Sequence, residues 1–165
     1  MKKKLLLLIV WIPCFGISQE LPTESAYGYV FPLGSKFTIK MHPTDSLGHD
    51  YSIIAFEPYE EIVDTWENEM LFAKEGEEGT IQFYFCLGTN GSTEEEKKKN
   101  RKVLLLMKNF TKKNFIYSSE IQREENGEFE KTSNVGTYSG AIGKEMWPYM
   151  IYSIGLNGFK VLNSK

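Results

Sequence analysis

Hydrophobic and polar residues alternate over several short stretches of the chain, and this period of two is typical of β-strands. Residues 36–41 read K-F-T-I-K-M, and residues 80–87 read T-I-Q-F-Y-F-C-L. The second stretch is apolar on both faces, which predicts a strand in the middle of a sheet. The other short runs rich in β-branched and aromatic residues span 27–31, 51–56, 103–107, 115–121, 128–132, 150–154 and 159–162.

Asn-Gly pairs mark two of the predicted turns. Asn126-Gly127 lies between residues 115–121 and 128–132. It predicts a hairpin with a type I′ turn, because that turn needs positive φ at both central residues. Asn157-Gly158 predicts a second turn between the last two strands. Strands joined by such short turns pair antiparallel.

Two segments interrupt the strand pattern. Residues 58–72 carry apolar side chains at helical spacing after a proline, which predicts a short helix; an edge strand over residues 61–66 is the alternative. Residues 92–102 read S-T-E-E-E-K-K-K-N-R-K, with acids before bases. Either Ser92 or Thr93 can form a capping box with the glutamate three residues later. This segment is expected to be a solvated excursion between two strands rather than a basic patch, because its glutamates offset its lysines.

These elements predict one all-β domain over residues 27–165, an immunoglobulin-like antiparallel β-sandwich of about eight strands with one short helix. A β-barrel or a jelly roll is the alternative architecture. Residues 103–121 read V-L-L-L-M-K-N-F-T-K-K-N-F-I-Y-S-S-E-I. This passage resembles the strand–polar turn–strand passages of bacterial immunoglobulin-like domains, and the resemblance implies the sandwich among these architectures.

The N-terminal residues have the layout of a secretory signal peptide. Lysines occupy positions 2–4, an apolar run follows over 5–11, and the small residues Gly16 and Ser18 precede Gln19. The pattern predicts a signal peptide over residues 1–18 and export to the periplasm or the extracellular space. A lipoprotein anchored through Cys14 is disfavoured, because the preceding Trp-Ile-Pro does not resemble a lipobox.

Cleavage before Gln19 would leave a polar, flexible leader over residues 19–26 and then the domain. It would remove three lysines, so Lys+Arg would fall from 19 to 16 against 22 Asp+Glu, a net charge of −6. An acidic chain is not expected to bind nucleic acid, whose phosphates require a basic face. Cys86 would be the only remaining cysteine, which excludes an intramolecular disulfide. No later apolar run is long enough to span a bilayer.

Both histidines lie in one stretch, M-H-P-T-D-S-L-G-H-D over residues 41–50. His42, Asp45, His49 and Asp50 are the candidate metal ligands, since a zinc-type site needs three or four converging nitrogen or oxygen donors. The same stretch is rich in turn-forming residues, so a plain loop between two strands is favoured over a metal site. A metal-dependent hydrolase would rest on these four residues.

Ser46 is a candidate modification site in the same loop. The tripeptide Asp45-Ser46-Leu47 resembles the Asp-Ser/Thr-hydrophobic acceptor of the general O-glycosylation systems of some exported bacterial proteins. The resemblance implies that a glycan would be attached at Ser46.

Aromatic residues suggest a ligand surface, because flat rings can stack on sugar faces. Trp66, Trp147 and Tyr149 are the candidate ligand-binding residues, although aromatics at alternating strand positions more often pack in a core. A sugar-binding role requires Trp66 or Trp147 to be substantially exposed.

No nucleophile elbow, P-loop or dinucleotide fingerprint occurs, and no cofactor is predicted. The leading hypothesis is therefore an exported, non-catalytic binding or envelope-associated module with a protein or glycan ligand. A carbohydrate-binding module is the first alternative, and the metal-dependent hydrolase is the second.

Overall fold

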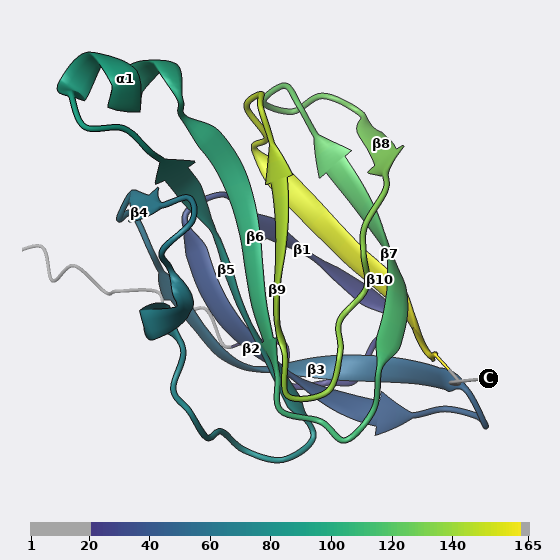
Figure 1. Ribbon diagram of the computed structural model, residues 1–165. Coiled ribbons are helices and arrows are strands. Elements are labelled where there is room, and N and C mark those ends of the chain that lie inside the picture. Colours follow the sequence, from purple (N-terminus) through teal and green to yellow (C-terminus); the bar gives the residue numbers. More distant parts are fainter. Residues whose placement is uncertain (1–20, 163–165) are drawn as a thin grey trace, which may run out of the picture.

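The computed structural model describes residues 21–162, and these residues form a nearly all-antiparallel β protein (Figure 1). The predicted all-β class is confirmed. The strands are β1 (Gly28–Pro32), β2 (Ser35–Pro43), β3 (Gly48–Pro58), β4 (Val63–Asp64), β5 (Thr80–Thr89), β6 (Lys102–Asn109), β7 (Phe115–Gln122), β8 (Phe129–Thr132), β9 (Ile142–Trp147) and β10 (Ser153–Val161). The helical elements are a 3-10 turn, η1 (Glu69–Leu71), and the helix α1 (Glu94–Lys99).

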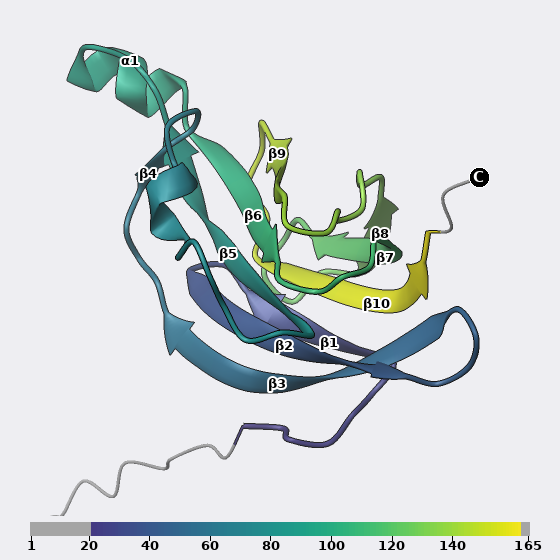
Figure 2. The same ribbon diagram turned by 60° about the horizontal axis from the view of Figure 1, so that its bottom comes forward.

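All ten strands belong to one hydrogen-bonded sheet, in the order β8-β7-β10-β3-β2-β5-β6-β9. β1 adds to β10, and β4 adds to β5 in the single parallel pairing among the described strands. The sheet curls strongly, so that β9 returns toward β7 and β8 (Figure 2). The arrangement is therefore one curled sheet, and the predicted two-sheet immunoglobulin-like sandwich is not confirmed.

The chain starts the curl at a sharp bend between β1 and β2. Gly34 has a φ of +82°, which a residue with a side chain rarely adopts. Before this bend β1 pairs with β10, and after it β2 pairs with β3 and β5. The two strands thus belong to different halves of the curl, and their rings meet inside it: the ring centroids of Phe31 and Phe37 lie 3.6 Å apart.

The inner side of the curl holds the main hydrophobic core. Along β2 every second residue is buried, from Ser35 to Met41, as the period-two pattern predicts. Burial of each large apolar side chain contributes about 1.5–3 kcal/mol. The inward residues that dominate this core are Phe31, Phe37, Ile39, Tyr51, Ile81, Phe83, Phe85, Val103, Leu105, Met107, Phe115, Ile154, Leu156 and Phe159.

Polar side chains link the two ends of the curled sheet. The Tyr117 hydroxyl of β7 donates a hydrogen bond of 3.1 Å to Glu145 Oε1 of β9. The Val135 backbone N–H donates to the same oxygen at 3.1 Å. Trp147 Nε1 of β9 donates to Thr132 Oγ1 of β8 at 3.1 Å. These contacts join β9 to strands that it does not pair with.

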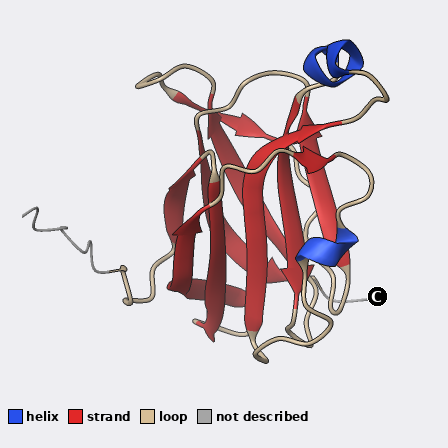
Figure 3. Cartoon of the chain, turned by 90° about the vertical axis from the view of Figure 1, so that its left-hand side faces the viewer, coloured by secondary structure: helices blue, strands red, loops and turns tan. Residues whose placement is uncertain are grey.

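Residues 59–79 cover the outer face of β5 and β6, and Figure 3 looks onto this side of the molecule. The predicted helix over residues 58–72 is wrong: the segment forms the short strand β4 and the 3-10 turn, so the edge-strand alternative was closer. Residues 63–64 form parallel strand pairs with β5 instead of the helix that the spacing of the apolar residues predicted. A second, smaller core results, formed by Val63, Phe72, Tyr84, Cys86, Leu104 and Leu106.

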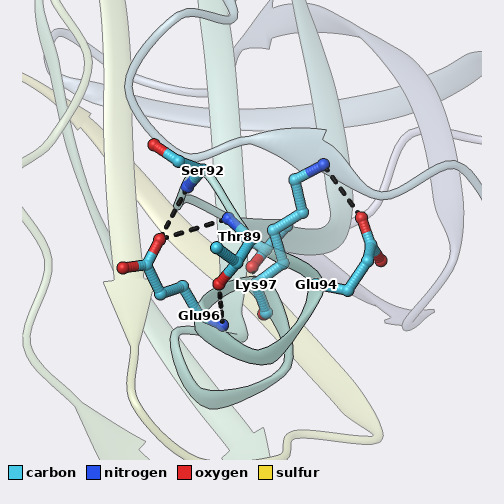
Figure 4. Close-up of polar contacts among 6 residues, drawn as sticks. Thr89, Ser92, Glu94, Glu96 and Lys97 are labelled. Carbon is cyan, nitrogen blue, oxygen red and sulfur yellow. Dashed lines mark hydrogen bonds and ion pairs between the residues drawn. The ribbon is translucent and has the colours of Figure 1, made fainter.

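The charged excursion after β5 has the predicted helix start. Thr93 Oγ1 accepts a hydrogen bond from Glu96 N, and Glu96 Oε2 accepts from Thr93 N and Ser92 N, which is a complete capping box (Figure 4). Of the two boxes that the sequence allows, the one at Thr93 forms. Lys97 pairs with Glu94 at 3.2 Å.

The two Asn-Gly pairs behave differently from each other. β7 and β8 form the predicted hairpin, but in its turn Asn126 has positive φ (62°) and Gly127 does not, so the turn is not type I′. Asn157-Gly158 forms no turn. It is a bulge inside the continuous strand β10, where the register with β7 shifts and Gly158 has a φ of +63°.

The predicted signal peptide and Cys14 lie outside the described residues. Within residues 21–162, no helix is long and apolar enough to cross a membrane.

Candidate functional site

Trp66 is the predicted aromatic that the structure leaves most open, with 57% of its surface exposed. It lies in the turn after β4, and Asp64 holds this turn. Asp64 Oδ1 accepts hydrogen bonds from Trp66 N at 2.7 Å and from Glu67 N at 2.8 Å. The bonds from Glu67 N and Trp66 N lower the pKa of the Asp64 carboxyl, so it stays ionised as the acceptor of this turn.

A buried asparagine fixes the same turn from beneath. Asn68 Nδ2 donates to the backbone carbonyl oxygens of Asp64 at 2.9 Å and Thr65 at 3.0 Å. The Lys144 amine also donates to the Thr65 carbonyl. The exposed indole of Trp66 is thus carried by a turn whose backbone is hydrogen-bonded on several sides.

Two lysine amines flank the Trp66 ring. Lys144 Nζ of β9 lies 5.5 Å from the ring centroid, and Lys102 Nζ of β6 lies 5.7 Å from it, distances typical of cation–π contact. Within residues 21–162, neither amine has a carboxylate oxygen within 4.0 Å. Burial lowers the pKa of the Lys144 amine, and Asp64 and Glu69 oppose that change.

A surface hollow of about 410 Å³ lies next to this turn, between β4, the end of β5 and helix α1. Its lining includes Asp64 of the Trp66 turn, and also Lys98 and Arg101. In the described part of the chain these two cations make no ion pair. Glu94 and Lys97 line the hollow too and pair with each other, so its lining carries both signs of charge, and Lys98 and Arg101 are its cations outside an ion pair in the described residues. The exposed ring, two amines without an ion pair among the described residues and the hollow together can hold a flat ligand that carries negative charge.

Trp147 and Tyr149 do not join this site. Trp147 is only 5% exposed and points into the curl, with its Nε1 bonded to Thr132. It is a core residue and not a stacking surface. Tyr149 is partly exposed in a separate hollow, where the Arg123 guanidinium lies 4.2 Å from its ring centroid. The structure therefore separates the three predicted aromatics.

The four predicted metal ligands are not brought together either. His42 and Asp50 are paired across β2 and β3 on the outer face, where His42 Nε2 lies 2.8 Å from Ser52 Oγ. His49 points inward and packs its ring edge-on against Phe115. Burial lowers the pKa of His49, which favours its neutral ring. No group of three or more His, Cys, Asp and Glu residues in the described chain could hold a metal ion.

Asp45 has a structural role in the loop between β2 and β3, where its carboxylate stabilises the turn. Asp45 Oδ1 accepts hydrogen bonds from Gly48 N at 2.6 Å and Leu47 N at 2.8 Å, and these bonds lower the pKa of its carboxyl. Ser46 is exposed at the tip of this loop, next to the exposed Leu47. Modification of Ser46 stays a prediction.

Sequence reasoning identified Trp66 but missed the lysines beside it. Lys102 and Lys144 come from strands that are distant in the chain, and only their pairing through β6 and β9 brings them to one ring. Comparisons of the chain with protein families, curated proteins and solved structures find no match. The interpretation of this site therefore depends on its own geometry.

Proposed function

We propose that the chain is an exported, non-catalytic binding module and that Trp66 is the centre of its ligand site. Export rests on the signal-peptide pattern of residues 1–18. The binding role rests on one observation: an exposed tryptophan on a hydrogen-bonded turn, with two lysine amines 5.5 and 5.7 Å from its ring centroid that make no ion pair with any described residue.

The cost of exposing Trp66 supports this role. A tryptophan carries a large apolar surface whose burial is favourable, so an indole that a folded protein holds in water loses that stabilisation. Asp64 and Asn68 order the backbone of the turn without burying the ring. A ring held in place before the ligand arrives loses little conformational entropy on binding, which favours affinity.

The chemistry of the surroundings favours a saccharide that carries carboxylates. A sugar ring presents an apolar face of C–H groups that can stack on indole, and carboxylates attract the amines of Lys102 and Lys144. Lys98 and Arg101, which line the neighbouring hollow together with Asp64 and Glu94, offer cationic partners beyond a single sugar unit. An oligosaccharide of uronic acids fits both features. This is the carbohydrate-binding alternative, narrowed to acidic sugars.

Isothermal titration of the chain from Gln19 with tetragalacturonic acid tests the proposal. We expect binding that Trp66→Ala abolishes. Lys102→Gln and Lys144→Gln should each weaken it by about two- to fivefold, since exposed ion pairs contribute about 0.2–1 kcal/mol. Lys160→Gln is the matched control, because this exposed lysine lies on β10, away from Trp66. Equal affinity of the wild type and Trp66→Ala, or no binding by the wild type, would contradict the proposal.

A further inference from the structure

The outer face of β10 carries a groove of about 580 Å³ that none of the predicted sites includes. Gly155 lies at the middle of this face, with Val30 of β1 on one side and Glu120 of β7 on the other, in regular antiparallel register. Tyr27 and Phe129 also line the groove, and they are 64% and 42% exposed. The volume is in the range of small-molecule sites, about 300–1,000 Å³.

The fold does not require glycine at position 155. Its φ is not in the positive region, and the bulge of β10 lies farther along the strand. A Cβ added there would meet only Val30 Cγ2 at 3.7 Å and atoms of Glu120 at 3.8 and 3.9 Å, which are ordinary contacts. At Gly28 of the same groove, in contrast, a Cβ would lie 2.6 Å from Asn157 Cβ.

Glycine inside a strand weakens it, and it often marks a place where a ligand comes close to the backbone. Since neither strain nor packing explains Gly155, its missing side chain has one clear effect: the groove is deeper by one side chain at this buried residue, between Val30 and Glu120. A larger residue there would fill the space between Val30 and Glu120.

Unused polar groups line the groove beside these apolar side chains. The Glu120 carboxylate and the Asn157 side-chain amide make no hydrogen bond or ion pair with any residue that the structure describes. Lys131 of β8 is the direct cross-strand neighbour of Glu120, so the face has little net charge. This face is nearly neutral and offers exposed aromatic rings, a carboxylate acceptor and an amide. These groups are complementary to a neutral sugar rather than to an ion.

We propose that this groove is a binding site for a neutral oligosaccharide, with Gly155 as its floor. Sugar hydroxyl or acetamido N–H groups donate to the Glu120 carboxylate, the Asn157 amide donates to ring or acetamido oxygens, and Tyr27 and Phe129 pack on the apolar sugar faces. The groove is separate from the Trp66 site, because it lies over β1, β10 and β7 rather than over β6 and β9. It does not depend on that site.

Backbone amide NMR of the chain from Gln19 tests this, with chitotetraose and cellotetraose as probes. We expect either sugar to shift the amide signals of residues 28–30, 118–120 and 155–157. Gly155→Val should weaken binding by about tenfold or more, because its side chain occupies the floor. Ser153→Val is the matched control: it lies on the same strand and outer face but does not line the groove.

Three results would overturn the proposal. In the first, neither sugar shifts the signals of the groove residues, whether or not it shifts signals near Trp66. In the second, Gly155→Val binds as tightly as the wild type. The third requires no ligand: thermal unfolding of Gly155→Ala should show an unchanged or raised Tm, and a clear fall would mean that packing requires the glycine. Each outcome is independent of tetragalacturonic acid binding at Trp66.

Discussion

Glu145 offers the sharpest test of how the curled sheet is closed. Glu145 is only 8% exposed, and its Oε1 accepts hydrogen bonds from the Tyr117 hydroxyl and from Val135 N. Burial raises the pKa of Glu145 above its ordinary 4.5, and the two hydrogen bonds only partly offset this. Burial also raises the pKa of Tyr117 well above its ordinary value, so its hydroxyl remains a donor.

The sign of the pH effect follows from the raised pKa. The folded protein holds the Glu145 proton more tightly than the unfolded chain does. The contribution of Glu145 to stability is therefore complete below pH 4.5 and is lost as pH rises through the folded pKa. Glu145→Gln cannot titrate. The free energy of unfolding of this variant minus that of the wild type should thus increase with pH from 4.5 upward, by at most about 1.4 kcal/mol per pH unit.

Tyr117→Phe isolates the hydrogen bond itself, because phenylalanine keeps the ring that stacks on Phe159 at a centroid distance of 4.9 Å. At a pH above the folded pKa of Glu145 the lost bond has a charged acceptor, so we expect a destabilisation of about 1.5–3 kcal/mol there. In the Glu145→Gln background the acceptor is neutral, and the same change should cost about 0.5–1.5 kcal/mol.

Urea unfolding of the wild type, the two single variants and the double variant, repeated from pH 4 to pH 8, measures these free energies. Subtraction of matched curves cancels the titration of exposed carboxylates such as Asp45 and Asp64. A pH-independent difference between Glu145→Gln and the wild type would contradict a raised pKa of Glu145 in the folded protein. An equal cost of Tyr117→Phe in both backgrounds would contradict a hydrogen bond from Tyr117 to a charged acceptor.

Three further predictions concern packing, thiol reactivity and export. Gly88→Ala should destabilise by about 1–3 kcal/mol in urea unfolding, because its Cβ would lie 2.3 Å from Leu104 Cδ1. An unchanged midpoint would contradict the close packing of the buried Leu104 side chain over Gly88. The Cys86 thiol, whose pKa burial raises to about 12, should react with a disulfide reagent only after unfolding, and fast reaction at pH 8 would contradict its burial. N-terminal sequencing of the exported protein should begin at Gln19, within two or three residues, and an intact Met1 would contradict cleavage.

The sequence predicted local structure well where the pattern itself determines it. Period-two alternation identified β2 and β5, and the two possible capping boxes limited the start of α1 to Ser92 or Thr93, of which the structure uses Thr93. The segment over residues 58–72 was misassigned because its apolar residues pack on the outer face of the sheet, while Asp64 and Asn68 hold turns in place of a helix. Helical spacing alone does not distinguish these cases.

The pairing of strands that are distant in the chain could not be predicted from the sequence. β10 pairs with β1, β3 and β7, and this combination turns a two-sheet expectation into one curled sheet. Asn157-Gly158 suits a bulge as well as a turn, since both use positive φ at glycine. For the candidate site, the sequence supplied Trp66 but not its lysines. For Trp147 it favoured the core position that the structure shows, but kept a sugar-stacking role as the alternative.

The proposed ligand site requires Trp66 to contact an acidic saccharide. The most direct measurement is the indole N–H NMR signal of each tryptophan in the chain from Gln19, which contains only Trp66 and Trp147. On titration with tetragalacturonic acid we expect the Trp66 signal to shift and saturate, with a smaller response at high salt. The buried Trp147 signal should stay in place. An unmoved Trp66 signal, or equal shifts of both signals, would contradict the account.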